Sequence, residues 1–328
     1  MRKQRFTVAM IVLLLVAVFY AAYWMKSLTT ASADGKTVTV VLKSLNVRSD
    51  FWQTVSAGAQ VAGKQAGAVI DMAGPLQEND AEAQIKALEE AIERKPQAIV
   101  VAPYAHERMP EMMQRIRDAG IRLVVIDTPL DVDPKPVFVG DDHREAGKLA
   151  GRTAVQETGS HPVAAILTDF KYSLVSEQRR EGVLDTLGDF PGSVYGTYYA
   201  GDSEDRAYDV AMSLLRDNKP DFNVIVALTP ATTLGAAKAI KETASGSKVR
   251  LIGFDSTIGE IQLLEEGVLN ATVVQKPFNM GYLGVKAALD LLDGKSVSST
   301  FIDSTVVSSA NMYTPEIQKL LFPFIENQ

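Results

Sequence analysis

Acidic, aromatic and amide side chains follow several short apolar runs of this 328-residue sequence. Such side chains can bind a small polar molecule, because carboxylates, amides and hydroxyls form hydrogen bonds with polar groups and aromatic rings cover apolar faces. The positions are Asp50, Phe51, Trp52, Asp127, Thr128, Thr229, Asp255 and Gln275. Their placement after separate runs predicts a binding site assembled from distant parts of the chain.

The sequence lacks the groups that an enzyme active site needs. It has three histidines at no recognisable spacing, no cysteine, no G-x-S-x-G elbow and no G-x-x-x-x-G-K-[ST] loop. Asp127 and Asp255 resemble a glycosidase pair, but carboxylates suit hydroxyl recognition equally well. Asp141, Asp142 and His143 are potential metal ligands, although a helix cap followed by the first helical turn is the simpler interpretation. We expect no catalysis, cofactor or metal.

The candidate binding residues also have structural interpretations. Asp50 is favoured as a helix N-cap, and Asp127 and Asp255 can cap helices or bind loop amides instead of a ligand. Phe51 and Trp52 can be core aromatics at the start of a helix. We favour ligand stacking for this pair, because adjacent residues on a helix do not share one core face.

Short β-rich runs alternate with helical periods, which is typical of βαβ units on parallel sheets. Nine runs are predicted strands: residues 38–42, 68–71, 98–102, 123–126, 164–167, 194–198, 224–227, 251–253 and 271–274. Most are unbroken apolar runs, as expected for strands covered on both faces. Nine to eleven strands suit two sheets of five or six. Ligands of such sheets bind beyond the carboxyl ends of the strands, where the candidate residues occur.

Three helix starts are predicted from capping signals. Asn79 and Glu82 fit a capping box, and Ser203 is a good N-cap before an apolar stripe. Asn279 precedes a third helix, which Gly294 ends.

The N-terminal segment is predicted to address a membrane. Arg2, Lys3 and Arg5 precede residues 6–25, a run without charge. The positive-inside rule keeps the N-terminus in the cytoplasm and places the rest outside, in the cell envelope. The run is near the length of about 20 residues that spans a bilayer, which favours an uncleaved anchor. A small-x-small site ending at Ala33 leaves cleavage as a signal peptide open.

Composition excludes several classes of protein. The formal net charge is −7 without a long basic run, so nucleic acid is an unlikely partner. The absence of cysteine excludes disulfides, thiol chemistry and a lipid-modified cysteine. A composition of 46% hydrophobic and 22% charged residues is that of a globular protein, and the length favours two domains of similar size.

Four stretches resemble the ribose-type family of periplasmic sugar-binding proteins, whose ligand domain also occurs in lactose-repressor-type regulators. The stretches are residues 45–52 (LNVRSDFW), 124–128 (VVIDT), 251–257 (LIGFDST) and 271–283 (ATVVQKPFNMGYL). Residues 177–182 (EQRREG) match the helix that begins the ligand face of the second lobe. A cytosolic repressor is excluded, because an apolar segment stands where its DNA-binding helices would precede the ligand domain.

The resemblance implies an α/β fold of two doubly wound parallel-sheet lobes joined by a three-strand hinge. The chain is expected to cross between lobes near Asp142, Gln275 and Thr305. Lobe 1 then comprises residues 37–141 with 276–304, and lobe 2 comprises residues 142–274 with 305–328. Residues 1–33 form the signal anchor, or the signal peptide plus linker. The ligand binds between the lobes, and the hinge closes.

The resemblance also assigns roles to the candidate residues. Phe51 and Trp52 match an aromatic pair that sandwiches the sugar, and Asp127 matches a carboxylate that binds ring hydroxyls. Asp255 and Gln275 match the polar pair of the other lobe and the hinge, although Gln275 can also serve the hinge alone.

Departures from the family pattern alter the expected cleft. The family's Asp-Arg step is Asp127-Thr128 here, and its Asn-Asp pair begins at Thr229. A family arginine falls at Glu177, which is a ligand contact or a solvated helix-start residue. Arg179 on the same helix is included in the predicted site. An aromatic position falls at Glu204, which we favour as a solvated helix start. The cleft is expected to lose its bidentate cations and become acidic, so an amine-bearing ligand is an alternative to a plain sugar.

The expected function is capture of a small polar ligand, most simply a sugar. The usual role in the family is delivery to an ABC permease. The apparent anchor without a lipid cysteine favours, as an alternative, a tethered sensor that presents its closed form to a histidine kinase.

Overall fold

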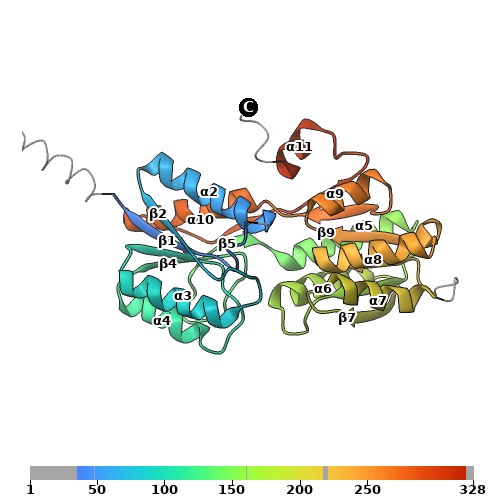
Figure 1. The fold of residues 1–328 in the computed structure, drawn as a ribbon, viewed down its shortest axis with the longest axis horizontal. Helices are drawn as coiled ribbons and strands as arrows, with labels where there is room; N and C mark the ends of the chain where they lie inside the picture. Colours follow the sequence, from blue (N-terminus) through green and yellow to red (C-terminus); the bar gives the residue numbers. More distant parts are fainter. Residues whose placement is uncertain (1–34, 48, 160, 217–220, 323–328) are drawn as a thin grey trace, which may run out of the picture.

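In the computed structural model, residues 35–47, 49–159, 161–216 and 221–322 are described. The predicted export segment and the cleavage site at Ala33 lie outside these ranges. Among the described residues, no helix has the length and hydropathy needed to cross a membrane. The folded part consists of two α/β lobes that lie side by side (Figure 1).

The first lobe contains a six-stranded sheet in the order β11-β5-β4-β3-β1-β2. Its strands are β1 (Thr37–Val41), β2 (Val69–Ala73), β3 (Ala98–Val101), β4 (Arg122–Ile126), β5 (Val137–Asp141) and β11 (Thr300–Ile302). Helices α2 (Asp50–Ala66) and α10 (Pro277–Leu292) cover one face, and α3 (Ala81–Arg94) and α4 (Met109–Asp118) cover the other (Figure 1).

The second lobe contains a six-stranded sheet in the order β12-β10-β9-β8-β6-β7. Its strands are β6 (Ala164–Thr168), β7 (Val194–Tyr199), β8 (Val224–Ala227), β9 (Arg250–Phe254), β10 (Ala271–Val274) and β12 (Thr305–Ser308). Its helices are α5 (His143–Glu157), α6 (Leu174–Leu187), α7 (Glu204–Leu215), α8 (Pro230–Glu242), η1 (Ser245–Ser247), α9 (Ile258–Glu265) and α11 (Pro315–Leu321). α5 and α6 cover one face of the sheet, and α7, α8 and α9 cover the other.

Both faces of each sheet are buried, as the unbroken apolar runs predict. On β3, Ala98 and Val100 join the cluster beneath α2 and α10, whereas Ile99 and Val101 join the cluster beneath α3 and α4. This alternation follows from the two-residue period of a strand. Each lobe therefore has three layers, with the sheet between two layers of helices.

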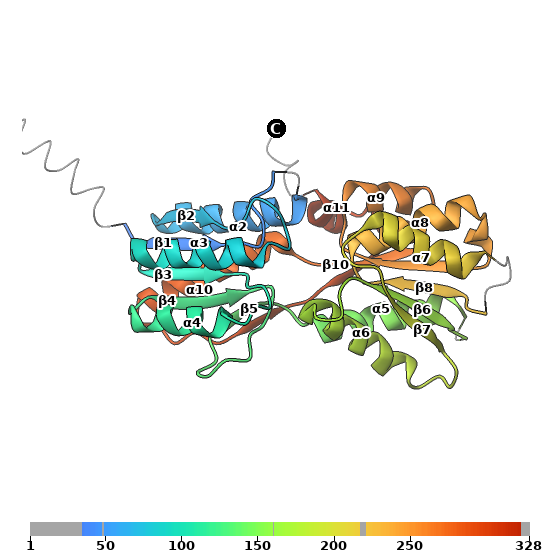
Figure 2. The same cartoon turned by 60° about the horizontal axis from the view of Figure 1, so that its bottom comes forward.

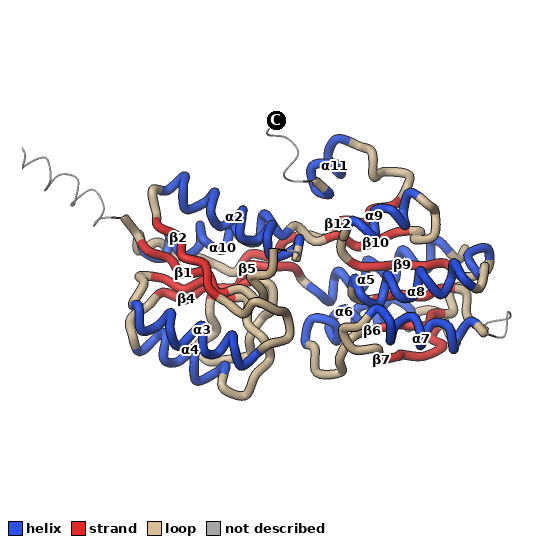
Figure 3. Tube along the Cα trace, in the orientation of Figure 1, coloured by secondary structure: helices blue, strands red, loops and turns tan. Residues whose placement is uncertain are grey.

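The nine predicted strands correspond to β1–β4 and β6–β10, and the prediction missed β5, β11 and β12. The missed β11 and β12 are only three and four residues long, which is too short for a clear hydrophobic pattern. The predicted fold class of two parallel-sheet lobes is confirmed, and one edge strand runs against the others. β12 pairs antiparallel with β10, whereas the other strand pairs are parallel. Figure 3 shows β12 beside β10 in the second lobe.

The chain passes between the two sheets three times. It leaves the first sheet after Asp141 at the end of β5, returns between Val274 of β10 and Pro277 of α10, and crosses again between β11 and β12. Figure 2 shows these segments running side by side between the lobes. The connection between the lobes is therefore narrow, as a hinge requires.

Helix caps correct two of the three predicted starts. Asp80, and not Asn79, caps α3 by accepting a hydrogen bond from Ala83 N at 2.9 Å. Asn79 instead has φ 66°, a left-handed conformation that asparagine tolerates. α10 begins at Pro277, two residues before Asn279, because proline fits the first helical position. The Ser203 cap of α7 is confirmed.

Two pairs of helices cross with their backbones in contact at glycines. A Cβ on Gly281 of α10 would lie 1.9 Å from the carbonyl oxygen of Val55 on α2. A Cβ on Gly147 of α5 would lie 2.0 Å from the carbonyl oxygen of Arg179 on α6. α2 and α6 carry predicted binding residues near their first turns, so these glycines help to set the position of the site.

Candidate ligand-binding cleft

A cavity of about 700 Å³ lies between the two lobes. Residues that follow strands of both sheets line it, as expected for ligand sites of open α/β sheets. Nine of the ten residues predicted from the sequence are among them: Asp50, Phe51, Trp52, Asp127, Thr128, Arg179, Thr229, Asp255 and Gln275. The sequence therefore indicated residues from both lobes of the lining, but the lining also includes segments that it did not indicate, such as Pro103, Tyr104 and Ala105.

Glu177 is the predicted residue that the structure does not place in the cleft lining. Its carboxylate accepts hydrogen bonds from Arg180 Nη2 at 2.8 Å and from the Tyr199 hydroxyl at 3.2 Å. Position 177 on α6 is half-buried and turned toward these partners. The solvated helix-start interpretation is closer to the structure, although Glu177 pairs within its own lobe.

Lys43 is a cleft residue that the sequence analysis missed. Its Nζ lies 2.7 Å from Asp127 Oδ2 and 2.7 Å from Thr128 Oγ1. Its ammonium also lies 5.8 Å from the ring centroid of Trp52 and 5.5 Å from that of Tyr104. Lys43 follows β1 by two residues. This position after a strand end was the feature of the sequence that could have indicated Lys43 as a cleft residue. The first lobe therefore supplies a cation beside Asp127, although threonine stands at position 128, where the family has arginine.

The Asp127 carboxylate is buried and ionised. Burial alone would raise its pKa, but the charge of Lys43 and the hydrogen bonds from Lys43 and Thr128 outweigh burial and hold the pKa below the ordinary value of 3.8. Thr128 Oγ1 also donates to Asp127 Oδ2 at 2.7 Å. His143 Nε2 lies 2.8 Å from the Asp127 carbonyl oxygen, which joins this loop to the start of α5. Asp127 is thus a fixed acceptor at the wall of the cleft.

Trp52 lines the cleft but is 3% exposed and belongs to the core of the first lobe. Its indole Nε1 donates a hydrogen bond to Glu78. Burial raises the pKa of Glu78, and Asp202 adds to the effect. Phe51 packs edge-on against Trp52, with ring centroids 4.9 Å apart, and is half-buried. Both rings contact one core cluster, so the expectation that they cannot share a core face is wrong.

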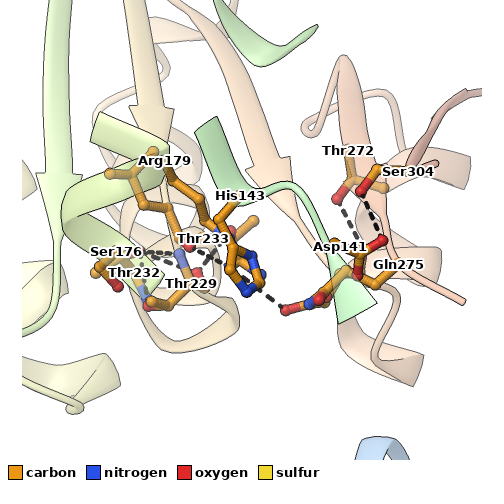
Figure 4. A network of polar contacts seen from close by, with 12 residues as sticks. Asp141, His143, Ser176, Arg179, Thr229, Thr232, Thr233, Thr272, Gln275 and Ser304 are labelled. Carbon is orange, nitrogen blue, oxygen red and sulfur yellow. Dashed lines mark hydrogen bonds and ion pairs between the residues drawn. The ribbon is translucent and has the colours of Figure 1, made fainter. Parts of the chain in front are cut away.

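The floor of the cleft includes Arg179 and Gln275, which belong to a polar network of the second lobe and the connecting segments (Figure 4). Arg179 is 3% exposed, donates through Nη1 to the Leu228 carbonyl at 2.8 Å and lies 3.9 Å from Asp255 Oδ2. Gln275 Nε2 donates to Asp255 Oδ1 at 2.8 Å. Burial raises the pKa of Asp255, and Arg179 opposes this. The network holds a carboxylate and an amide at the hinge.

The two lobes present their main carboxylates through the same backbone geometry. Asp127 follows β4 with φ 63°, and Asp255 follows β9 with φ 72°. A positive φ costs free energy in a residue other than glycine and persists where the surroundings require it, often at functional sites. Asp255 does not cap α9, because Thr257 does so by accepting a hydrogen bond from Glu260 N. The capping interpretation of Asp255 is therefore wrong.

Two buried polar atoms at the floor have no hydrogen-bond partner among the described residues. They are Arg179 Nε and Gln275 Oε1. Leaving such an atom unpaired costs about 1–3 kcal/mol. A donor and an acceptor without partners, both on residues that line the cleft, match the hydroxyl groups of a polar ligand.

The cleft carries more negative than positive charge, as the sequence predicted. Its lining includes the carboxylates of Asp50, Glu78, Asp127, Asp169, Asp202 and Asp255. The cations in the same lining are Lys43 and Arg179. The expected loss of cations is therefore only partial. Asp50 is the first residue of α2, preceded by Ser49 at the N-cap position, so the N-cap interpretation of Asp50 is wrong by one residue.

Asp141, Asp142 and His143 do not form a metal site, and each side chain has its own surroundings. Asp142 caps α5 by accepting a hydrogen bond from Glu145 N at 3.0 Å. His143 is 1% exposed, and burial lowers its pKa to about 4, so the imidazole is neutral. Within the described ranges, no group of three His, Cys, Asp or Glu side chains is arranged to hold a metal ion.

Two α/β lobes, a narrow connection and a polar cleft between them define a hinged solute-binding protein. A family model described as "Periplasmic binding protein domain" matches residues 38–296. The chain belongs to this family, and the resemblance seen in the four sequence stretches is confirmed. Family members bind solutes and are not enzymes.

Individual relatives have sugar-related names. The chain is 25% identical to a D-ribose/D-allose-binding protein of Pseudomonas aeruginosa, over 79% of this chain and 83% of the relative. A carbohydrate transporter solute binding protein from Agrobacterium radiobacter, solved with D-arabinose, is 28% identical with a TM-score of 0.80, over 88% of this chain and 99% of the other. A sugar transporter from Clostridium phytofermentans is 34% identical with a TM-score of 0.73, over 83% and 98% of the two chains.

Proposed function

We propose that this protein captures a monosaccharide by closing its two lobes around it, outside the cytoplasm. The observation that carries the proposal is the cleft itself, where Asp127 of one lobe and Asp255 of the other line one cavity together with half-buried Phe51. Hydroxyl edges of a sugar suit the carboxylates, and its C–H faces suit the ring. The names of the relatives support the same class of ligand.

Closure is the proposed mechanism. The lobes move as residues 37–141 with 276–304 and residues 142–274 with 305–328. A ligand that contacts both lobes only in the closed form shifts the population toward it, because the affinities for the two forms differ. Closing also excludes water, which strengthens the hydrogen bonds of the buried carboxylates.

Calorimetry and tryptophan emission test the proposal. A chain beginning at Asp34 retains Trp52 as its only tryptophan. Because Trp52 lines the cleft, its emission is expected to shift when a pentose or hexose binds. The panel includes amino sugars and polyols, since the cleft is acidic. If no sugar produces heat or an emission change, the proposal is wrong.

We propose delivery to an ABC permease as the role of the closed form, following the relatives that are named as transport proteins. The alternative is a membrane-tethered sensor read by a histidine kinase, favoured by the uncharged run at residues 6–25 and the absence of cysteine. Neighbouring permease and ATPase genes would support delivery, and a neighbouring kinase gene would support sensing. Membrane anchoring is tested by fractionation of cells that express the full chain.

A hydrogen bond between the lobes is expected to contribute to closure. Asn79 Nδ2 of the first lobe donates to Asp202 Oδ2 of the second lobe at 2.7 Å. Asn79→Gly removes the donor and suits the left-handed φ of 66°. Ligand affinity measured by calorimetry is expected to fall about 2- to 10-fold, the value of one net hydrogen bond.

Asn79→Asp is the matched variant for this bond. It keeps the size of the side chain but places a second carboxylate against Asp202, so its affinity is expected to fall below that of Asn79→Gly. The melting temperatures of both variants are measured to exclude misfolding. Equal affinity in the original protein and both variants would show that the bond does not stabilise the closed form.

A further inference from the structure

The cleft lining contains more carboxylates than its own cations can neutralise. Lys43 Nζ lies 2.7 Å from Asp127 Oδ2, and Arg179 Nη1 lies 3.9 Å from Asp255 Oδ2, so each cation of the lining already has a carboxylate. Four further carboxylates of the lining form no ion pair with a Lys, Arg or His among the described residues. They are Asp50, Glu78, Asp169 and Asp202. The cleft therefore has an excess of negative charge.

Two of these four carboxylates belong to loops of opposite lobes that touch. Glu78 lies between β2 and α3 of the first lobe, and Asp202 lies between β7 and α7 of the second. Asn79, which follows Glu78, donates through Nδ2 to Asp202 Oδ2 at 2.7 Å, so the two loops are in contact. Burial raises the pKa of Glu78, and repulsion from the Asp202 carboxylate adds to the rise. Two like charges therefore lie close together where the lobes meet, and their repulsion opposes closure.

The first lobe shows how this cleft holds an ammonium group. The ammonium of Lys43 lies 2.7 Å from the Asp127 carboxylate and 5.5 Å from the ring centroid of Tyr104. The Tyr104 hydroxyl accepts a hydrogen bond from Asn79 N at 2.7 Å, so this ring is adjacent to the loop that carries Glu78. Burial raises the pKa of Tyr104, and Glu78 and Asp127 add to the rise. This part of the cleft thus offers carboxylates beside an aromatic ring, which suit a second ammonium group.

Unpaired buried atoms at the floor of the same cleft indicate where the rest of the ligand binds. Arg179 Nε and Gln275 Oε1 have no hydrogen-bond partner among the described residues, and both residues are 3% exposed and line the cleft (Figure 4). A donor and an acceptor suit hydroxyl groups, which both donate and accept. This observation is independent of the acidic residues, and together they indicate a ligand with hydroxyls on one side and a cation on another.

We propose that the ligand is an amino sugar, whose protonated amino group is bound between Glu78 of the first lobe and Asp202 of the second. An ammonium group has three N–H donors and a positive charge, so it binds both carboxylates and removes the repulsion between the lobes. A hydroxyl group in its place has one donor and no charge. The inference rests on the proposed function and adds to it the class of sugar and the two residues that select it.

Calorimetry with pairs of sugars that differ in one group tests the inference. D-Glucosamine, D-galactosamine and D-mannosamine are each compared with the parent hexose at about pH 6.5, where the amino group is largely protonated. We expect one of the amino sugars to bind at least about tenfold more tightly than its parent, because hydrogen bonds to charged groups are the stronger ones. Added NaCl is expected to reduce this preference, because salt screens charges that solvent reaches. D-Ribose, D-allose and D-arabinose complete the panel.

Glu78→Gln and Asp202→Asn test the two residues. Each substitution removes a charge but keeps an oxygen that accepts the hydrogen bond from Trp52 or from Asn79. In both variants, the preference for the amino sugar over its parent hexose is expected to fall about tenfold. Asp189→Asn is the matched control, because Asp189 is an exposed carboxylate of the second lobe outside the cleft lining. Its preference is expected to equal that of the original protein, and melting temperatures of all variants exclude misfolding.

The outcomes separate the inference from the proposed function. Tighter binding of an amino sugar, with a lower preference in both variants, would support the inference. Binding of plain sugars that equals or exceeds binding of the amino sugars would overturn the inference and leave the proposed function intact. An unchanged preference in either variant would overturn the bridging role of Glu78 and Asp202. No heat from any sugar of the panel would overturn the proposed function and the inference together.

Discussion

Asp141→Asn is expected to stabilise the protein by about 4 kcal/mol more at pH 8 than at pH 4. Asp141 ends β5 and is 2% exposed. Burial raises its pKa from 3.8 to about 7; Arg179 opposes this rise, whereas Asp127 and Asp255 add to it. Its Oδ1 is 3.4 Å from the Ser304 hydroxyl, which donates to it, and its Oδ2 has no partner among the described residues.

The direction of this pH dependence follows from the protonation of Asp141 in the folded and unfolded states. Below about pH 4 the carboxyl is protonated in both states. As the pH rises toward 7, the unfolded chain releases the proton and the folded protein keeps it, so the free energy of unfolding falls by about 1.4 kcal/mol per pH unit. Above about pH 7 the loss is complete. Asparagine cannot ionise and retains the stability that aspartate loses.

Urea denaturation at pH 4, 6 and 8 measures the difference. Asp303→Asn is the control, because Asp303 is an exposed carboxylate on the crossover between β11 and β12, next to Ser304. The difference in unfolding free energy between Asp141→Asn and the original protein should grow with pH, while that for Asp303→Asn should stay nearly constant. A pH-independent difference for Asp141→Asn would contradict the raised pKa.

Asp141 and Ser304 lie on two of the three segments that join the lobes. Ionisation of Asp141 therefore places a buried charge at the hinge, where the proposed closure requires the chain to change conformation. Ligand affinity measured for Asp141→Asn at pH 6 and pH 8 shows whether this charge also affects the closing equilibrium.

Gly281→Ala is expected to destabilise the first lobe by about 3 kcal/mol, at the upper end of typical overpacking. The new Cβ would lie 1.9 Å from the Val55 carbonyl oxygen and 3.0 Å from Ala59 N. These contacts are with backbone atoms, so no side-chain rotation relieves them and α10 must move away from α2. A drop in melting temperature of about 2–4 °C per kcal/mol is expected for domains of this size.

Gly246→Ala is the control for the helix crossing. A Cβ on Gly246 would meet nothing closer than Ile240 Cγ2 at 3.6 Å, which is ordinary contact. Its melting temperature is expected to match that of the original protein within experimental error. An equal effect of the two substitutions would mean that the α2–α10 crossing tolerates separation.

The two-lobed fold was predictable because parallel strands buried on both faces leave an unbroken apolar run. β3 and β8, whose four residues are all buried, show this directly. The strand β12 was not predictable, because a short run rich in Thr and Ser becomes a strand only where β10 provides a partner. The start of α3 was misplaced by one residue, because Asn79 and Asp80 are both good caps and only the contact of Asn79 with Asp202 separates them.

Part of the cleft was also predictable from the sequence. Asp127 and Asp255 follow strand ends, and the topology of open α/β sheets brings such positions together. The prediction failed for Glu177, whose side chain on α6 turns to Arg180 and Tyr199. It missed Lys43 because no motif accompanies a lone lysine after a strand.

The sequence by itself determined the two lobes and the chain segments that surround the cleft, because hydrophobic periodicity and strand-end positions are local properties. Only the tertiary structure decided which of the polar and aromatic candidates are available to a ligand. Trp52 is in the core with Lys43 over its ring, whereas Phe170 lines the cleft. Pairing between residues distant in the chain determines this, and spacing along the sequence does not encode it.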